Sequence, residues 1–178
     1  MEILLYVAAG LAATVVAVLL VVSFFLPASY RVERRVTMRG RPDAIFEYLN
    51  NLQHWPTWTT WTVARYPDMQ TTFSGPQRGV GAVYRWTGKS VGVGSLKLTH
   101  SDPQRGIEYD LDFDNGKFLS HGTITMAASD DSVTVTWANS GQLGRNPISR
   151  YFGLLMDRMM GPDFQKGLET LKSKIEAA

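Results

Sequence analysis

The sequence predicts an α+β fold. A curved antiparallel sheet of about seven strands packs on one long C-terminal helix, and a single transmembrane helix precedes them. Three patterns lead to this prediction. The chain begins with a long uncharged apolar run, its middle alternates between apolar and polar residues, and its end returns to helical spacing. We therefore expect a helix and linker over residues 1–29 and one folded domain over residues 30–178.

The apolar run extends from Ile3 to Leu26, 24 residues without a charge. As a helix it would be about 36 Å long, which exceeds the roughly 30 Å of a bilayer's hydrocarbon core. Tyr6 and Tyr30 lie near its two ends, where aromatic side chains suit the membrane interface. Pro27 ends the helix. The run is thus expected to be a single-pass anchor in the cell membrane.

Two alternatives remain for this run, a cleaved signal peptide and a buried core helix. A signal peptide has a basic start and an apolar stretch of about 7–15 residues, whereas only Met1 and Glu2 precede this longer run. Five arginines follow it and none precedes it, which by the positive-inside rule places the domain in the cytoplasm. These arginines could instead serve the first strand: Arg31, Arg34, Arg35, Arg39 and Arg41.

The domain begins with a strand over residues 30–39, in which Arg34 interrupts the apolar face. Pro42 suits the first turn of a helix, and apolar residues then recur at helical spacing up to Leu52. Three of the five tryptophans fall between Trp55 and Trp61. We expect a short second helix or turn there, with its aromatic rings packed on an apolar surface.

About six strands separated by tight turns follow over residues 68–141, and the alternation is clearest from Ile107 to Phe113. From Ser149 to Glu176 the apolar spacing is helical, with Gly161-Pro162 predicting a bend. A sheet of this size curls, and the long helix must bury its apolar stripe against it. This combination predicts an internal space between sheet and helix.

Several stretches resemble the START-like, Bet v 1-like superfamily, also called SRPBCC, and within it the polyketide cyclase/dehydratase-like branch. The resemblance covers residues 30–175. The matching stretches are Arg31-Val32-Glu33-Arg34, Pro42 to Leu49, His54 to Trp58, Gly79 to Trp86, Gly153 to Asp157 and Gly161 to Phe164.

The resemblance implies a helix-grip fold with a deep apolar cavity. The sequence supplies candidate wall residues, although each could simply fill the core. They are Trp58, Tyr84, Trp86, Leu96, Leu98, Tyr109, Leu111, Phe113, Trp137, Phe152, Met156 and Met159. Arg34 is the candidate for binding an acidic ligand head, because it lies on the apolar side of its strand.

Signals for catalysis or metal binding are weak. The chain has no cysteine, and its three histidines (His54, His100 and His121) show no spacing that pairs them with an acid. The acids from Glu108 to Asp114 alternate along one strand, as on a solvated face. We expect neither a metal nor a cofactor. The net charge of +2 does not favour nucleic acid as a partner.

Three functions fit these observations. The favoured one is a non-catalytic, membrane-anchored domain that binds an apolar or amphipathic small molecule such as a lipid, isoprenoid or polyketide. The first alternative is a cyclase/dehydratase-like enzyme that uses a His, Tyr or Asp in the cavity. The second is a protein-interaction module at the membrane, with the tryptophan-rich loop as its contact surface.

Overall fold

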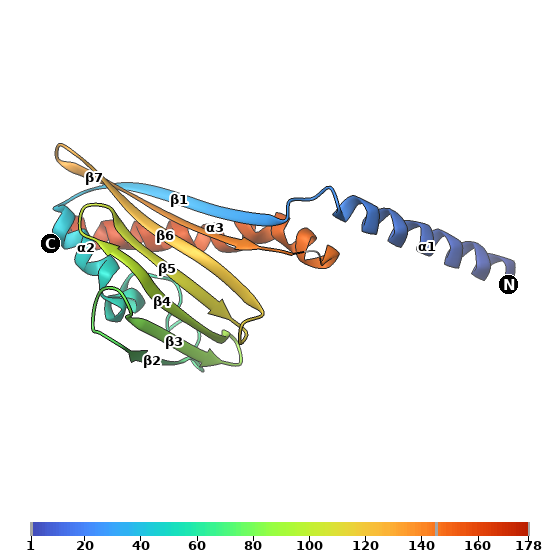
Figure 1. Cartoon of the computed structure of the whole chain (residues 1–178), viewed down its shortest axis with the longest axis horizontal. Coiled ribbons are helices and arrows are strands. Elements are labelled where there is room, and N and C mark those ends of the chain that lie inside the picture. The colour runs from blue at the N-terminus through green and yellow to red at the C-terminus, as the bar shows by residue number, and fades with distance from the viewer. Residues whose placement is uncertain (1, 145, 178) are drawn as a thin grey trace.

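The computed structural model describes residues 2–144 and 146–177 (Figure 1). It confirms the α+β prediction, with seven strands and one long C-terminal helix. In chain order, the elements are α1 (Glu2–Ser23), β1 (Ser29–Arg39), α2 (Pro42–Asn50), the 3₁₀ helix η1 (Leu52–Thr57), β2 (Gln70–Ser74), β3 (Val83–Gly88), β4 (Gly92–Asp102), β5 (Gly106–Phe113), β6 (Phe118–Ser129), β7 (Ser132–Gln142) and α3 (Pro147–Glu176).

The seven strands form one antiparallel sheet in the order β1-β7-β6-β5-β4-β3-β2. Consecutive strands from β2 to β7 are neighbours, as tight turns between short strands predict. The first strand, β1, pairs with the last, β7, over its full length. The long helix α3 lies on one face of the sheet, chiefly along β1 (Figure 1). We call this face the inner face and the opposite one the outer face.

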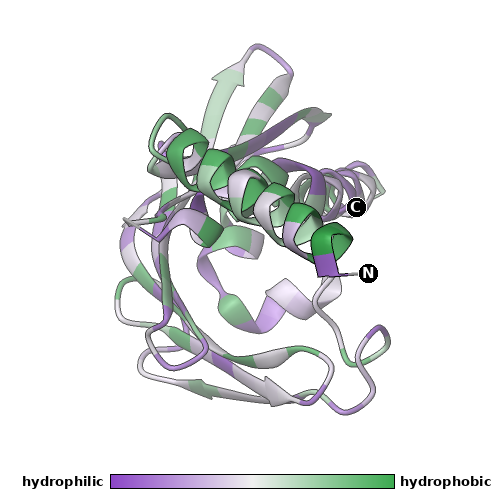
Figure 2. Ribbon diagram, turned by 90° about the vertical axis from the view of Figure 1, so that its right-hand side faces the viewer, coloured by the Kyte–Doolittle hydropathy of each residue, from purple (hydrophilic) through white to green (hydrophobic). Residues whose placement is uncertain are grey.

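Helix α1 is hydrophobic along its length and projects away from the domain (Figures 1 and 2). Its most apolar 18 residues are all exposed. Its length and composition suit a membrane span as well as a signal sequence. The helix ends at Ser23, three residues before the predicted end. The amides of Phe24, Phe25 and Leu26 bond to carbonyls three residues earlier, so the last turn is tightened before Pro27.

Helix α3 begins two residues earlier than predicted. The Asn146 side chain accepts a hydrogen bond from the Ile148 amide at 2.9 Å, and Pro147 occupies the first turn. The helix continues through Pro162 as a single element. Beyond that proline, its apolar residues are buried against the domain: Phe164, Leu168, Leu171 and Ile175.

The tryptophan-rich segment closes one end of the inner face. Trp58 packs on Trp137 of β7 with ring centroids 5.2 Å apart, and Phe164 of α3 stacks on Trp137 at 4.2 Å. The indole of Trp55 donates to the Leu49 carbonyl at 2.9 Å, which ties η1 to α2. The predicted apolar packing of these rings is therefore the core that joins sheet, η1 and α3.

Candidate functional site

Cross-strand register groups the inner-face residues into rows that run across the sheet. The deep row contains Val32, Asn139, Gly122, Tyr109 and Leu98. The hydroxyl row, one step closer to the end where α1 joins, contains Tyr30, Gly141, Ser120, Leu111, Leu96 and Tyr84. The rim row, one step further, contains Phe118, Phe113, Gly94 and Trp86.

Burial decreases steadily from the deep row to the rim row. All five residues of the deep row are buried. In the hydroxyl row, Tyr30, Ser120 and Leu111 are only partly buried, and in the rim row Phe118 is 60% exposed. Solvent therefore reaches the inner face from the end of the domain that follows α1. The opposite end is closed by the tryptophan core.

A hydrogen-bonded network lies at the border between the deep row and the hydroxyl row. The Tyr30 hydroxyl donates to Asn139 Oδ1 at 3.0 Å, and Asn139 Nδ2 donates to Ser120 Oγ at 3.2 Å. Beside it, the Trp137 indole donates to the Tyr109 hydroxyl at 2.8 Å. Asn139 is fully buried, so these bonds offset the cost of removing its amide from water.

Two glycines let the tyrosine rings of this network lie flat on the sheet. A Cβ on Gly122 would come within 2.0 Å of the Tyr109 ring, and one on Gly141 within 2.6 Å of the Tyr30 ring. Any other residue at these two positions would force the rings away from the sheet. The glycines therefore set the position of the two hydroxyl groups.

The tyrosines of the inner face remain protonated near neutral pH. Burial raises the pKa of Tyr84 to about 12 and also raises the pKa values of Tyr30 and Tyr109 above their ordinary value. Tyr84 Oη is buried and has no hydrogen-bond partner among the residues that the structure describes. The hydroxyl row therefore offers a donor at Tyr84 that a ligand oxygen or a water could satisfy.

The predicted wall residues separate into three groups. Those buried in the core are Trp58, Tyr84, Leu96, Leu98, Tyr109 and Trp137. Those partly buried at the open end of the inner face or on the inner side of α3 are Trp86, Leu111, Phe113 and Met156. The remaining two, Phe152 and Met159, are 54% and 56% exposed.

Phe152 and Met159 belong to an apolar stripe that points away from the sheet. At 100° per residue, Ile148, Phe152, Leu155 and Met159 fall within a 60° arc, which we call the outer stripe. The buried residues Phe164 and Leu168 point roughly 150° away from it. Met156 and Met160, by contrast, pack against the core. The structure thus places Met156 beside the inner face and the outer stripe on the outside of α3.

Arg34 lies on the inner face as predicted, but it is paired with an acid. Its Nη1 and Nη2 donate to the two carboxylate oxygens of Asp157 on α3 at 2.7 and 3.0 Å. The Arg34 hydrogen bonds hold the pKa of Asp157 below its usual range. An acidic ligand head would have to displace Asp157, so Arg34 mainly joins α3 to β1.

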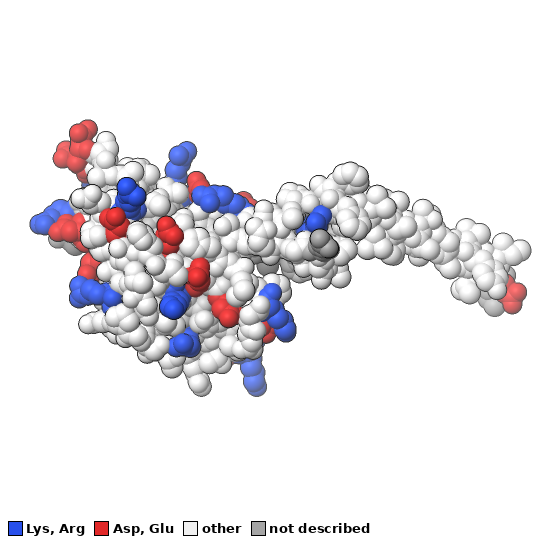
Figure 3. Space-filling model, viewed as in Figure 1, with Lys and Arg blue, Asp and Glu red and all other residues white. Residues whose placement is uncertain are grey.

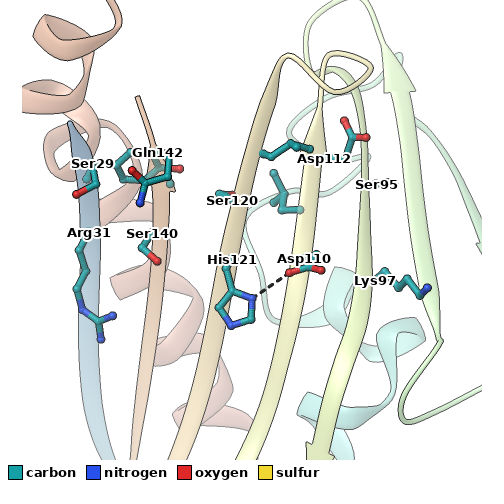
Figure 4. A pocket seen from close by; sticks show the side chains of 14 residues that line it. Ser29, Arg31, Ser95, Lys97, Asp110, Asp112, Ser120, His121, Ser140 and Gln142 are labelled. Atoms are coloured by element: carbon teal, nitrogen blue, oxygen red, sulfur yellow. Dashed lines mark hydrogen bonds and ion pairs between the residues drawn. The ribbon is translucent and has the colours of Figure 1, made fainter. Parts of the chain in front are cut away.

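A broad hollow lies on the outer face (Figure 4). It is an open groove of about 930 Å³ across five strands. Charged side chains of both signs line it, including Arg31, Lys97 and Asp110. An apolar ligand there would remove these charges from water without replacing their hydration. We therefore regard the inner face, and not this groove, as the candidate site for an apolar ligand.

His121 lies in the outer groove and is paired with acids, which its sequence spacing did not indicate. Its Nδ1 lies 2.9 Å from Asp110 Oδ1 (Figure 4). Its Nε2 lies 3.4 Å from Glu108 Oε2. The pairing comes from the register between β5 and β6. The described residues contain no group of three or more His, Cys, Asp or Glu side chains that could hold a metal ion.

The sequence alone does not indicate that Tyr30, Ser120 and Asn139 belong to one site. Alternation places Ser120 on one face with Gly122 and Ile124, but alternation within one strand does not indicate which strands adjoin. The network depends on contacts among β1, β6 and β7, which the chain order alone leaves open.

Comparison with known proteins locates the domain within a family. Residues 29–176 match the family described as "Polyketide cyclase / dehydrase and lipid transport". A search of curated proteins gave no match. Among solved structures, the Aha1 dimer from Colwellia psychrerythraea aligns with a TM-score of 0.56 at 15% identity, covering 82% of this chain and 96% of that one.

Two further structures share the fold. The di-domain ARO/CYC StfQ from the steffimycin biosynthetic pathway aligns with a TM-score of 0.63 at 11% identity, covering 84% of this chain and 51% of that one. Ara h 8.0201 aligns with a TM-score of 0.54 at 13% identity, covering 84% of this chain and 99% of that one. At these identities the likeness supports the fold and not a particular activity.

Proposed function

The chain belongs to the polyketide cyclase / dehydrase and lipid transport family, and on that premise we propose that its domain binds an apolar or amphipathic small molecule on the inner face of the sheet. The ligand class includes lipids, isoprenoids and polyketide-like compounds. In this proposal the domain, residues 30–178, binds without catalysing a reaction, and α1 anchors it in the cell membrane.

The observation that carries the proposal is the hydroxyl row. It combines apolar side chains such as Leu111 with hydroxyl groups at Tyr30, Ser120 and Tyr84, in the zone where burial gives way to solvent. Ligand sites usually have this composition, a mostly apolar wall with a few placed polar groups. An amphipathic molecule would lay its chain against the rim row and direct an oxygen to the Ser120 or Tyr84 hydroxyl.

The side chains of the inner face support binding without acid–base catalysis. The inner-facing positions of the seven strands, as register defines them, contain no His, Asp or Glu within the described residues. Asp157 of α3, which meets the inner face, is paired with Arg34. A cyclase- or dehydratase-like proton transfer would need such a group, or a tyrosine of lowered pKa, within reach of the ligand. The three inner-face tyrosines have raised pKa values instead.

Two of the three rings in the tryptophan-rich loop, which the interaction-module alternative uses as its contact surface, are buried in the core. Trp58 is only 1% exposed and Trp55 is buried beside it. Truncating either ring would remove part of the core, so a lost partner and a lost fold would be difficult to separate.

A membrane anchor beside the domain is consistent with a ligand from the bilayer. The domain follows α1 after the short segment between Ser23 and Ser29, and solvent reaches the inner face from the same end. The five arginines near the anchor favour a cytoplasmic domain. Three of these, Arg31, Arg34 and Arg41, form ion pairs within the domain, so they also serve the fold.

Photo-crosslinking in lipid nanodiscs tests the site. The full chain is mixed with a diazirine-labelled fatty acid, irradiated and mapped by peptide mass spectrometry. We expect crosslinks on inner-face peptides of β3, β5 and β6, besides those on α1 that report simple membrane contact. Ser120→Phe should suppress the inner-face crosslinks by filling the space beside Leu111.

His121→Phe is the matched control, because it adds the same ring one residue away on the outer face. It should leave the inner-face crosslinks unchanged. Crosslinks that persist in Ser120→Phe and disappear in His121→Phe would instead assign the ligand to the outer groove. Circular dichroism of both variants checks that the fold is retained.

A further inference from the structure

The start of α3 carries an apolar surface that the domain does not cover. The outer stripe of Ile148, Phe152, Leu155 and Met159 is exposed along its length. Phe24 and Phe25, which follow α1, are 70% and 85% exposed. Among the described residues, the surface of the domain that Figure 3 shows next to α1 carries few charged side chains, whereas charges of both signs are scattered over the rest of that view.

This surface is joined to the end of α1 by side chains of α3. Arg150 Nη1 donates to the carbonyls of Ser23, Phe24 and Leu26 at 3.0, 3.1 and 3.4 Å. The Tyr151 hydroxyl donates to the Leu19 carbonyl at 2.8 Å. The last carbonyls of a helix lack partners within the helix and carry partial negative charge, so the Arg150 guanidinium is a fitting cap for α1.

These contacts fix the position of α3 along the axis of α1. When α1 spans a bilayer, they therefore determine how deep the start of α3 lies. With 22 residues, α1 is about 33 Å long, slightly more than the roughly 30 Å hydrocarbon core. The headgroup layers extend the bilayer to about 40–45 Å, or roughly 5–8 Å on each side. Tyr151 reaches a carbonyl four residues before the end of α1, about 6 Å along its axis. The first turns of α3 therefore lie at the level of the headgroup layer.

We propose that the first two turns of α3, together with Phe24 and Phe25, lie in the interfacial layer of the bilayer and form a second membrane contact of the domain. The inference rests on the anchoring role of α1 in the proposed function. Aromatic and aliphatic side chains bind this layer by burying apolar area at the boundary of headgroups and acyl chains. Arg150 fixes the orientation in which the domain meets the lipid.

Depth measurement with spin labels tests this inference, because the cysteine-free chain makes every introduced cysteine unique. Single cysteines replace Ile148, Phe152, Lys166 or Leu11 in the full chain. Each is spin-labelled in nanodiscs of phosphatidylcholine and phosphatidylglycerol. Accessibility to oxygen, which concentrates in lipid, is compared with accessibility to a water-soluble nickel chelate. Lys166 is the matched control, since it lies 18 residues after Ile148 on the same side of α3 and is exposed.

We expect the ratio of oxygen to nickel accessibility to be severalfold higher at Ile148 and Phe152 than at Lys166, and highest at Leu11. Equal ratios at Phe152 and Lys166, with a high ratio at Leu11, would overturn the second contact and leave the anchor intact. Protection of Phe152 from both reagents would overturn it as well, since that pattern indicates a protein contact such as a second copy. A low ratio at Leu11 would overturn the anchor and the inference together. None of these outcomes depends on whether the inner face binds a ligand.

Discussion

At the scale of single residues, the inner face is distinguished by hydrogen-bonded polar side chains among its apolar ones. Burying a polar group costs free energy unless it is hydrogen-bonded, and Asn139 avoids this cost through its bonds to Tyr30 and Ser120. Leu or Val at position 139 would fill the core without needing hydrogen-bond partners. The network therefore gives the inner face a directional character that an apolar core lacks.

Removing the Tyr109 hydroxyl should destabilise the domain. Tyr109→Phe leaves the buried Trp137 indole without its acceptor, which costs about 1–3 kcal/mol of unfolding free energy. Urea denaturation of the detergent-solubilised chain, followed by circular dichroism, measures this loss. Tyr66→Phe is the control, because Tyr66 is only partly buried. Equal stability of the two variants would show that the bond to Trp137 contributes nothing.

The sequence predicted these residues only in part. Tyr109 and Trp137 are among the wall residues that the sequence predicts, and both lie on the inner face. Their mutual hydrogen bond could not be predicted, because it bridges two strands that are separated in the sheet by β6. The same holds for the pairing of His121 with Asp110 across β5 and β6.

At the scale of elements, α3 combines two apolar stripes with different directions. From Met159 to Phe164 the chain advances five residues, about 140° around the helix. The stripe that contains Phe164 packs on the sheet, whereas the outer stripe, which ends at Met159, points away from it. Helical spacing alone predicted the helix correctly. The change of direction was present in the sequence and could have indicated that Phe152 and Met159 do not face the same surface as Phe164.

Truncating one phenylalanine on each stripe should distinguish the two faces. Phe164→Ala removes a ring stacked on Trp137 and should cost about 3–5 kcal/mol of unfolding free energy. Phe152→Ala should cost less than about 1 kcal/mol, because its ring is largely exposed. Urea denaturation of both variants checks this. Similar losses would show that the outer stripe is packed within the domain.

The contact between α1 and α3 should depend on one arginine. Arg150→Ala removes the three hydrogen bonds to the end of α1, so the angle between α1 and the domain should vary more widely. Distance distributions between spin labels at Leu11→Cys and Lys166→Cys would broaden. Arg158→Ala, an exposed position on the same helix, should leave them unchanged. A distribution that stays narrow in Arg150→Ala would show that other contacts hold the joint.

At the scale of the whole molecule, the order of elements was the most informative property of the sequence. One strand, two short helical segments, six strands and a long helix allow few compact arrangements, and the observed sheet is one of them. The sequence could not indicate where the inner face remains open. That depends on how far α3 extends past the sheet and on which residues meet across seven strands.

Separating the domain from α1 is expected to leave it folded. Contacts from α1 to the domain occur at the end of the helix, where Arg150 and Tyr151 bond to its backbone. The core lies entirely within the domain. A chain of residues 27–178 should therefore keep the circular dichroism spectrum of an α+β protein and unfold cooperatively in urea. An unfolded product would show that α1 is part of the core.

In the proposed function, the inner face and not the outer groove holds an apolar ligand. The most direct test is native mass spectrometry of residues 27–178 mixed with a long-chain fatty acid. We predict a one-to-one complex for the unmodified domain and for His121→Phe, and its loss in Ser120→Phe. A complex that survives Ser120→Phe and is lost in His121→Phe, or no complex with the fatty acid at all, would rule out binding on the inner face.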